Sequence, residues 1–162
     1  MRWIKRIAFL ILALFIAAQF IPVNRSNPAV DPAKTIYAAG IVPANIHTIL
    51  QRSCKDCHSD ETHWPWYSYV APVSWLVASD VHDARDEVNL SEWAGYNQRR
   101  KDHKLEEICE QVRGHRMPDS KYTLIHRGAF MSEAERVEVC QWTEAARKMI
   151  VAPPAQAPDK SQ

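Results

Sequence analysis

The run Cys54-Lys55-Asp56-Cys57-His58 is the stretch of this 162-residue sequence that decides its fold and its chemistry. Two cysteines separated by two residues and followed directly by a histidine form CxxCH, the pattern that attaches haem c. In a helical turn the two sulfurs are spaced to bond the two vinyl groups of a porphyrin, and the histidine then lies under the iron. The run therefore predicts one covalently bound haem c at Cys54 and Cys57, with His58 as an axial ligand of the iron.

Three other interpretations of this run stay open. A redox-active dithiol also uses CxxC, but it normally begins a helix after a strand, and the segment before Cys54 has a helical pattern. A zinc site drawn from Cys54, Cys57, His58 and His63 needs two adjacent residues to reach one tetrahedral ion. The third interpretation is a structural disulfide between Cys54 and Cys57 in an exported domain.

The N-terminus has the pattern of an export signal. Arg2, Lys5 and Arg6 precede an apolar run from residue 7 to 21 that only Gln19 interrupts. No clear cleavage site ends this run, so residues 1–22 are predicted to remain as a signal anchor, a single transmembrane helix. Cleavage after the alanines at 17–18 stays open. The basic end stays in the cytoplasm, which predicts a location at the inner membrane with the following domain in the periplasm.

The rest of the chain divides by composition. Residues 23–35 hold prolines and small polar residues, which predict an extended and unpacked linker. Residues 36–150 form the expected haem-binding domain. The proline-rich tail, 151–162, is expected to be disordered.

Helical periodicity recurs in the expected domain, while no convincing alternating strand appears and glycine is scarce. Four segments carry the pattern: one after Pro43 that runs into Cys54, one from about Pro72 to Glu87, one through Leu105 and Val112 that Gly114 ends, and one opened by a capping box at Ser132 and Glu135. We therefore predict an all-α fold, a helical domain around one haem.

A second axial ligand is expected in a low-spin electron carrier, and Met117 is the best candidate. It precedes Pro118, which stiffens the loop, and it lies outside any helical stripe. A thioether is a soft ligand that favours reduced iron. His115 and His126 remain the alternatives.

Beyond CxxCH, the sequence resembles the membrane-anchored haem-binding domain family of bacterial c-type cytochromes, whose members carry a single CxxCH behind an N-terminal anchor. The resemblance covers about residues 42–146, and its order of elements is similar to that of class I cytochromes c. It is carried by Cys54-Lys55-Asp56-Cys57-His58-Ser59, Thr62-His63-Trp64-Pro65-Trp66-Tyr67-Ser68, Ala71-Pro72-Val73-Ser74-Trp75-Leu76, Asn89-Leu90-Ser91-Glu92-Trp93, Met117-Pro118, Tyr122, His126 and Trp142. The cysteine pair Cys109 and Cys140 is a departure from the pattern of this family.

Aromatic and sulfur side chains extend the expected site. Four aromatic side chains after His58 are predicted to pack their flat faces against the haem: Trp64, Trp66, Tyr67 and Trp75. The remaining cysteines, Cys109 and Cys140, lie on apolar faces of two helices, and an oxidising compartment favours a disulfide between them over two buried thiols.

Together these features predict a monohaem electron carrier, not an enzyme, whose partners are redox proteins of the membrane or periplasm and whose N-terminal helix contacts the membrane. A net charge of only +1 gives no reason to expect a nucleic-acid partner. The alternative is a haem enzyme, or a gas or redox sensor, in which the sixth ligand is displaceable.

Overall fold

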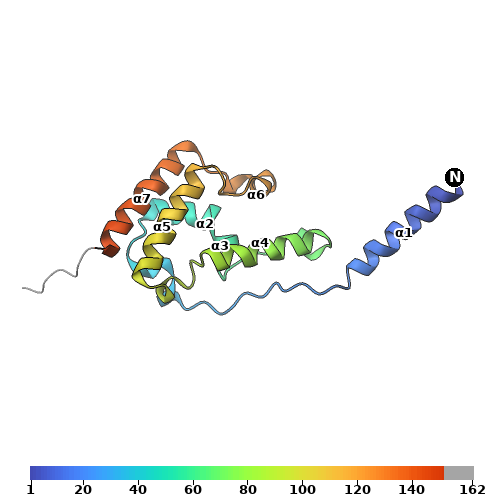
Figure 1. The fold of residues 1–162 in the computed structure, drawn as a ribbon, viewed down its shortest axis with the longest axis horizontal. Helices are drawn as coiled ribbons and strands as arrows, with labels where there is room; N and C mark the ends of the chain where they lie inside the picture. Colours follow the sequence, from blue (N-terminus) through green and yellow to red (C-terminus); the bar gives the residue numbers. More distant parts are fainter. Residues whose placement is uncertain (152–162) are drawn as a thin grey trace, which may run out of the picture.

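The structure, a computed structural model, describes residues 1–151, and every regular element in that part of the chain is a helix, with no strand. The all-α prediction is therefore confirmed for the described residues. The predicted tail, 151–162, falls outside them except for its first residue. Figure 1 shows a cluster of helices from which the N-terminal helix projects.

Two long antiparallel helices form the main layer of the domain. They are α5 (Gln98–Arg113) and α7 (Glu133–Val151), which pack side by side (Figure 1). The shorter α2 (Ala44–Ser53) lies against α7. The apolar faces of these helices meet in one core, whose buried members include Ile46, Leu50, Leu105, Val112, Val139, Trp142 and Ala146.

A second group of helices carries the CxxCH run and its neighbours. The single turn α3 (Lys55–His58) follows α2 and packs on α4 (Val73–Glu87). The short α6 (Ser120–Ile125) lies between α5 and α7 in sequence. Five 3-10 turns complete the order: η1 (Pro32–Lys34), η2 (Ile36–Ala39), η3 (Trp66–Tyr69), η4 (Trp93–Gly95) and η5 (Arg127–Ala129).

The four predicted helices are confirmed, together with the boundaries that were predicted for them; the start of α5 at Gln98 and the end of α7 at Val151 were not predicted. The first of them ends at Ser53, with Cys54 as its C-cap, and the helix after Pro72 ends at Glu87. Gly114 caps α5, as predicted. The four-residue α3 and the six-residue α6 were not predicted, because elements this short show no apolar periodicity.

The capping box of α7 is formed as predicted. The Ser132 Oγ accepts the Glu135 N–H at 3.3 Å, while the Glu135 carboxylate accepts the Ser132 N–H at 2.8 Å. Arg52 of α2 also donates to this carboxylate, at 2.8 Å. The pKa of Glu135 is lowered, chiefly by the hydrogen bond from the Ser132 backbone. Because the ionised form makes these bonds, the carboxylate stabilises the fold above its ordinary pKa.

Replacing Glu135 with glutamine should therefore lower the free energy of unfolding by about 1 kcal/mol at pH 7. A lowered folded-state pKa means that this contribution is lost as the pH falls through it, so the difference from wild type should fade below about pH 4. Guanidinium denaturation at pH 7 and pH 3 measures both values. Glu144→Gln is the control, since Glu144 lies exposed on the same helix without a described polar contact. An equal deficit at both pH values would contradict the prediction.

The prediction of a transmembrane helix over residues 1–22 is not supported. The helix α1 covers Arg2–Ala18, with none of its residues buried. Its 17 residues rise about 26 Å, which is short of the roughly 30 Å of a bilayer's hydrocarbon core. Among the described residues, no helix combines the length and apolar character needed to cross a membrane.

The predicted linker, residues 23–35, is extended up to η1, but the expectation that it is unpacked was wrong. Arg25 donates to the carbonyl oxygen of Ser68 at 3.1 Å, and Asn27 donates to that of Thr62 at 2.9 Å. Arg85 of α4 donates back to Ser26 and Asn27. The small polar residues that suggested a free linker supply the hydrogen-bonding groups that fasten it to the domain.

Candidate functional site

The CxxCH run occupies a break between two helices. Cys54 is the C-cap of α2, and its N–H donates to the carbonyl oxygen of Leu50 at 3.0 Å. Its own carbonyl oxygen accepts from the N–H groups of Cys57 and His58, at 3.3 and 3.0 Å, which starts α3. Within one turn the chain therefore presents both thiols and the imidazole.

The two thiols of this run are half-buried and unpaired in the structure. Burial raises the pKa of Cys54 to about 12 and that of Cys57 to about 11. A redox-active dithiol instead needs a lowered pKa and usually follows a strand, whereas α2 precedes this run. A structural Cys54–Cys57 disulfide is not formed either. Across residues 1–151, no group of three or more His, Cys, Asp or Glu side chains is arranged to hold a metal ion.

His58 is held in one tautomer by the end of α4. Its Nδ1 lies 2.9 Å from the carbonyl oxygen of Ala84 and 3.2 Å from that of Val88. Because carbonyl oxygens only accept, Nδ1 must carry the ring proton, which leaves the lone pair on Nε2. Burial lowers the pKa of His58 and so favours the neutral ring. In the described residues Nε2 makes no hydrogen bond, so the imidazole has the form that metal-bound histidines take.

A polar chain joins the CxxCH run to α6. The Tyr122 hydroxyl donates to the Asp56 carboxylate at 2.8 Å, and the Tyr122 ring stacks on His126 with centroids 4.4 Å apart. The Tyr67 hydroxyl is 2.6 Å from His126 Nε2. Burial and the bond to Asp56 both raise the pKa of Tyr122. This chain brings η3, α6 and the CxxCH run together.

The predicted aromatic residues occupy different environments. Tyr67 is half-buried and contacts Trp66 edge to face, but Trp66 itself is 78% exposed. Trp75 is also exposed. Trp64 lines a cavity of about 330 Å³ together with residues of α4, and its buried indole N–H has no described partner.

Met117 lies on the loop between α5 and α6 and is 37% exposed. Its N–H donates to the carbonyl oxygen of Gln111 at 3.1 Å. The alternative ligands are engaged elsewhere: His115 Nε2 is 3.4 Å from the Glu133 carboxylate, and His126 faces Tyr67. The Met117 thioether has no described polar partner, whereas each of the two histidines has one ring nitrogen, Nε2, engaged in this way.

The structure adds groups that sequence reasoning missed. The carbonyls of Ala84 and Val88 carry no signature, since any residue supplies a carbonyl. Arg136 is buried and donates to the Met117 carbonyl oxygen. A signal for it existed, because position 136 lies three residues before Val139 on the apolar stripe of α7, where an arginine is out of place.

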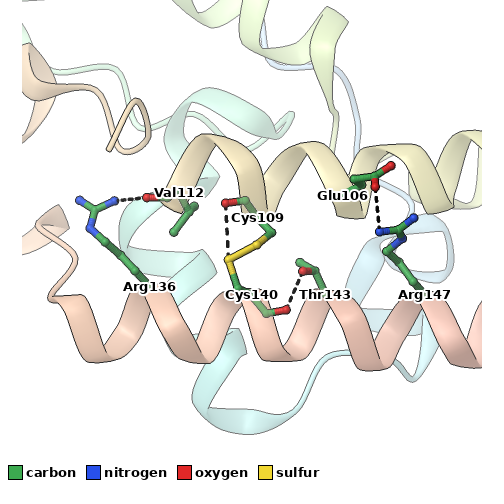
Figure 2. The surroundings of a disulfide bond; sticks show 7 residues. All are labelled: Glu106, Cys109, Val112, Arg136, Cys140, Thr143 and Arg147. Carbon is green, nitrogen blue, oxygen red and sulfur yellow. Dashed lines mark hydrogen bonds and ion pairs between the residues drawn. A yellow bond between two sulfur atoms is a disulfide. The ribbon is translucent and has the colours of Figure 1, made fainter. Parts of the chain in front are cut away.

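The disulfide expected between the other two cysteines is confirmed. Cys109 of α5 bonds to Cys140 of α7 across their packed faces, as Figure 2 shows. Both half-cystines are buried. The disulfide is close in sequence to Arg136 and to one of its hydrogen-bond partners: Val112 is three residues after Cys109, and Arg136 is four residues before Cys140.

Comparison with known proteins supports the haem-binding part of the resemblance in the sequence. The model of the family described as "Haem-binding domain" matches residues 13–145, which extends upstream of the domain predicted from residue 36. The family's description names haem binding and no catalysed reaction. No curated protein and no solved structure matches the chain. Because the match spans most of the sequence, the chain belongs to the haem-binding domain family.

Proposed function

We propose that this haem-binding domain is a monohaem c-type cytochrome that carries electrons. Haem c would be bound through thioethers to Cys54 and Cys57, and His58 would hold the iron through Nε2. One observation carries the proposal: the carbonyls of Ala84 and Val88 fix the proton on His58 Nδ1 and leave Nε2 free for iron. The two unpaired thiols in the same turn supply the groups that thioether bonds need.

Met117 is proposed as the sixth ligand. Its thioether is available, while the rings of His115 and His126 already have polar partners. When bound, haem supplies an iron that changes oxidation state by one electron, and a thioether ligand stabilises its reduced form. The protein's part is to hold both ligands in place in both states, so that little rearrangement accompanies electron transfer.

The aromatic residues after His58 are proposed to line the cofactor. Trp64 has an indole N–H that is buried without a described partner, which a haem propionate would satisfy. Several apolar side chains are exposed on elements that contact α2, α3 or the CxxCH run, among them Leu76 of α4, Leu124 and Ile125 of α6, and Phe130 after η5. A large apolar cofactor between these elements would cover such surface.

The periplasm, on the outer side of the inner membrane, is the proposed location. The basic N-terminus followed by an apolar run supports export, and the Cys109–Cys140 disulfide supports an oxidising compartment. Redox proteins of the membrane or periplasm are the proposed electron donors and acceptors.

Replacing Met117 with alanine should remove the weak near-infrared band that sulfur–iron ligation gives the oxidised protein. The reason is that alanine offers no donor atom, so water or another base takes the sixth position. Optical spectra of the purified, haem-loaded full chain measure the band. Met131→Leu is the matched control, because Met131 is a buried core methionine and the change conserves volume. A band that survives in Met117→Ala, or that wild type lacks, would refute the assignment.

A second function has one observation in its favour. The 2.6 Å pair of Tyr67 and His126 offers polar groups of the kind that stabilise a bound gas or oxidised substrate in haem sensors and enzymes. In that function Met117 would be displaced by the exogenous ligand. Carbon monoxide separates the two: rapid binding to the reduced protein supports a sensor or enzyme, and the absence of binding supports the electron carrier.

A further inference from the structure

Arg136 is a charged side chain in the interior of the domain. It is 7% exposed, and an arginine is rarely buried unless hydrogen bonds and charges compensate for its lost hydration. One guanidinium nitrogen, Nη1, donates to the carbonyl oxygen of Val112 at 2.7 Å and to that of Met117 at 2.8 Å. The nearest carboxylate, on the largely exposed Glu133, is 3.6 Å from Nε and forms no hydrogen bond with it. Main-chain carbonyls are therefore the principal partners of this buried cation.

These two carbonyls belong to adjoining parts of the chain. Val112 lies in the last turn of α5, where the helix dipole favours a cation, and its carbonyl oxygen also accepts from the His115 N–H at 3.1 Å. Met117 lies in the loop that follows. Its N–H donates to Gln111, so Arg136 completes a pair of bonds that hold the main chain of Met117 on both sides.

We propose that Arg136 is a positioning residue for Met117, and that it keeps the thioether available as the sixth ligand of haem by fixing the main chain that carries it. This inference rests on the proposed function. A thioether is a weak ligand that competes with water and bases, so the cost of ordering its loop decides how often it leaves the iron. Arg136 lowers that cost because its bonds to Met117 and to α5 exist before the ligand binds.

The competing explanation is that Arg136 only joins α7 to α5. Arg147 offers a matched comparison, because it lies on the same helix on the other side of the disulfide, as Figure 2 shows. It bonds Asp102 at 2.8 Å and Glu106 at 3.2 Å, both on α5, and it makes no described contact with the Met117 loop. A readout of Met117 ligation therefore distinguishes the two roles.

The experiment uses the haem-loaded full chain with Arg136→Gln, Arg136→Lys and Arg147→Gln. Imidazole is titrated into each oxidised protein, and its binding is followed by loss of the near-infrared sulfur–iron band. Imidazole binds only when Met117 has left, so its apparent affinity reports that population. We expect about tenfold tighter binding in Arg136→Gln, since bonds from a charged donor are lost. Arg136→Lys should be intermediate, because an ammonium keeps a charged donor but on a shorter side chain than the guanidinium, and Arg147→Gln should match wild type.

Each other outcome overturns one identifiable claim. Wild-type affinity in both Arg136 variants, with the band intact, overturns the positioning role and leaves Met117 as a ligand. An equal change in Arg147→Gln also overturns it, because the effect would then belong to the whole α5–α7 interface. Absence of the band in wild type overturns the sixth-ligand assignment in the proposed function instead. If Arg136→Gln does not fold, Arg136→Lys decides: tighter imidazole binding supports the role, and wild-type affinity overturns it.

Discussion

Replacing Cys54 and Cys57 together with serine should abolish covalent attachment of haem. Each thioether forms when a cysteine thiol adds across a vinyl group, the sulfur bonding one carbon and the proton going to the other, and a serine hydroxyl does not undergo this addition under cellular conditions. In the structure these are the only unpaired cysteines among the described residues, so no other thiol can take their place. Mass spectrometry of the denatured polypeptide should find the mass of the chain alone in this variant, and the mass of the chain plus one haem in wild type.

The single variants and a matched control make this prediction specific. Cys57→Ser and Cys54→Ser should each retain haem through one thioether, with an altered spectrum of the pyridine complex, because one vinyl group stays unsaturated. Cys54 also packs against the core, so its variant should be the less stable of the two. Replacing Cys109 and Cys140 with serine makes the same chemical change elsewhere and should leave the haem mass intact. A covalent haem mass on the Cys54/Cys57 double variant would contradict haem attachment at this site.

Local signals in the sequence were sufficient for the long helices. Both ends of α2 and α4, the end of α5 and the start of α7 followed from apolar spacing together with Pro43, Pro72, Gly114 and the Ser132 capping box. Helix caps and apolar periodicity are local properties of the sequence, so they can be identified without knowledge of the tertiary fold. By contrast, α3 and α6 are too short to carry a period, and only their contacts with neighbours stabilise them.

The candidate site divides in the same way. CxxCH is a contiguous pattern, so Cys54, Cys57 and His58 could be identified from the sequence alone. The groups that orient His58 are main-chain carbonyls of α4, 26 and 30 residues away, and no residue type marks them. The chain from Asp56 through Tyr122 and His126 likewise depends on a fold that brings distant segments together.

Polar composition was a poor guide to packing before η1. Asn27 and Ser26 were expected in a free linker, but they bond to Thr62 and Arg85 of the domain. A polar composition indicates that a segment buries few apolar side chains. It does not tell whether the segment forms hydrogen bonds with the domain, because that depends on the path of the segment in the fold.

Removing the Cys109–Cys140 disulfide should produce the largest loss of stability. The cystine joins two residues that are 31 positions apart in sequence, and in the chain-entropy model closing a loop of this length in the unfolded chain is worth about 3–4 kcal/mol. The Cys109→Ala, Cys140→Ala double variant, loaded with haem, should lose about this much free energy of unfolding in guanidinium denaturation followed by circular dichroism. Alanine is preferred to serine because a buried hydroxyl would add its own cost at these positions.

The contacts between α5 and α7 predict that the double variant is less stable than wild type but keeps the same fold. On either side of the disulfide, Arg136 bonds the end of α5 and Arg147 bonds Asp102 and Glu106, so the two helices stay aligned without the cross-link (Figure 2). Circular dichroism before denaturation should therefore match wild type, and reduction of wild type with a thiol should reproduce the lower midpoint. If the free energy of unfolding of the double variant lies within about 0.5 kcal/mol of the wild-type value, the cross-link does not lower the entropy of the unfolded chain as the chain-entropy model requires. A loss well above 4 kcal/mol would instead indicate that the cystine also supports packing between α5 and α7, because its sulfurs fill buried volume that alanine leaves empty.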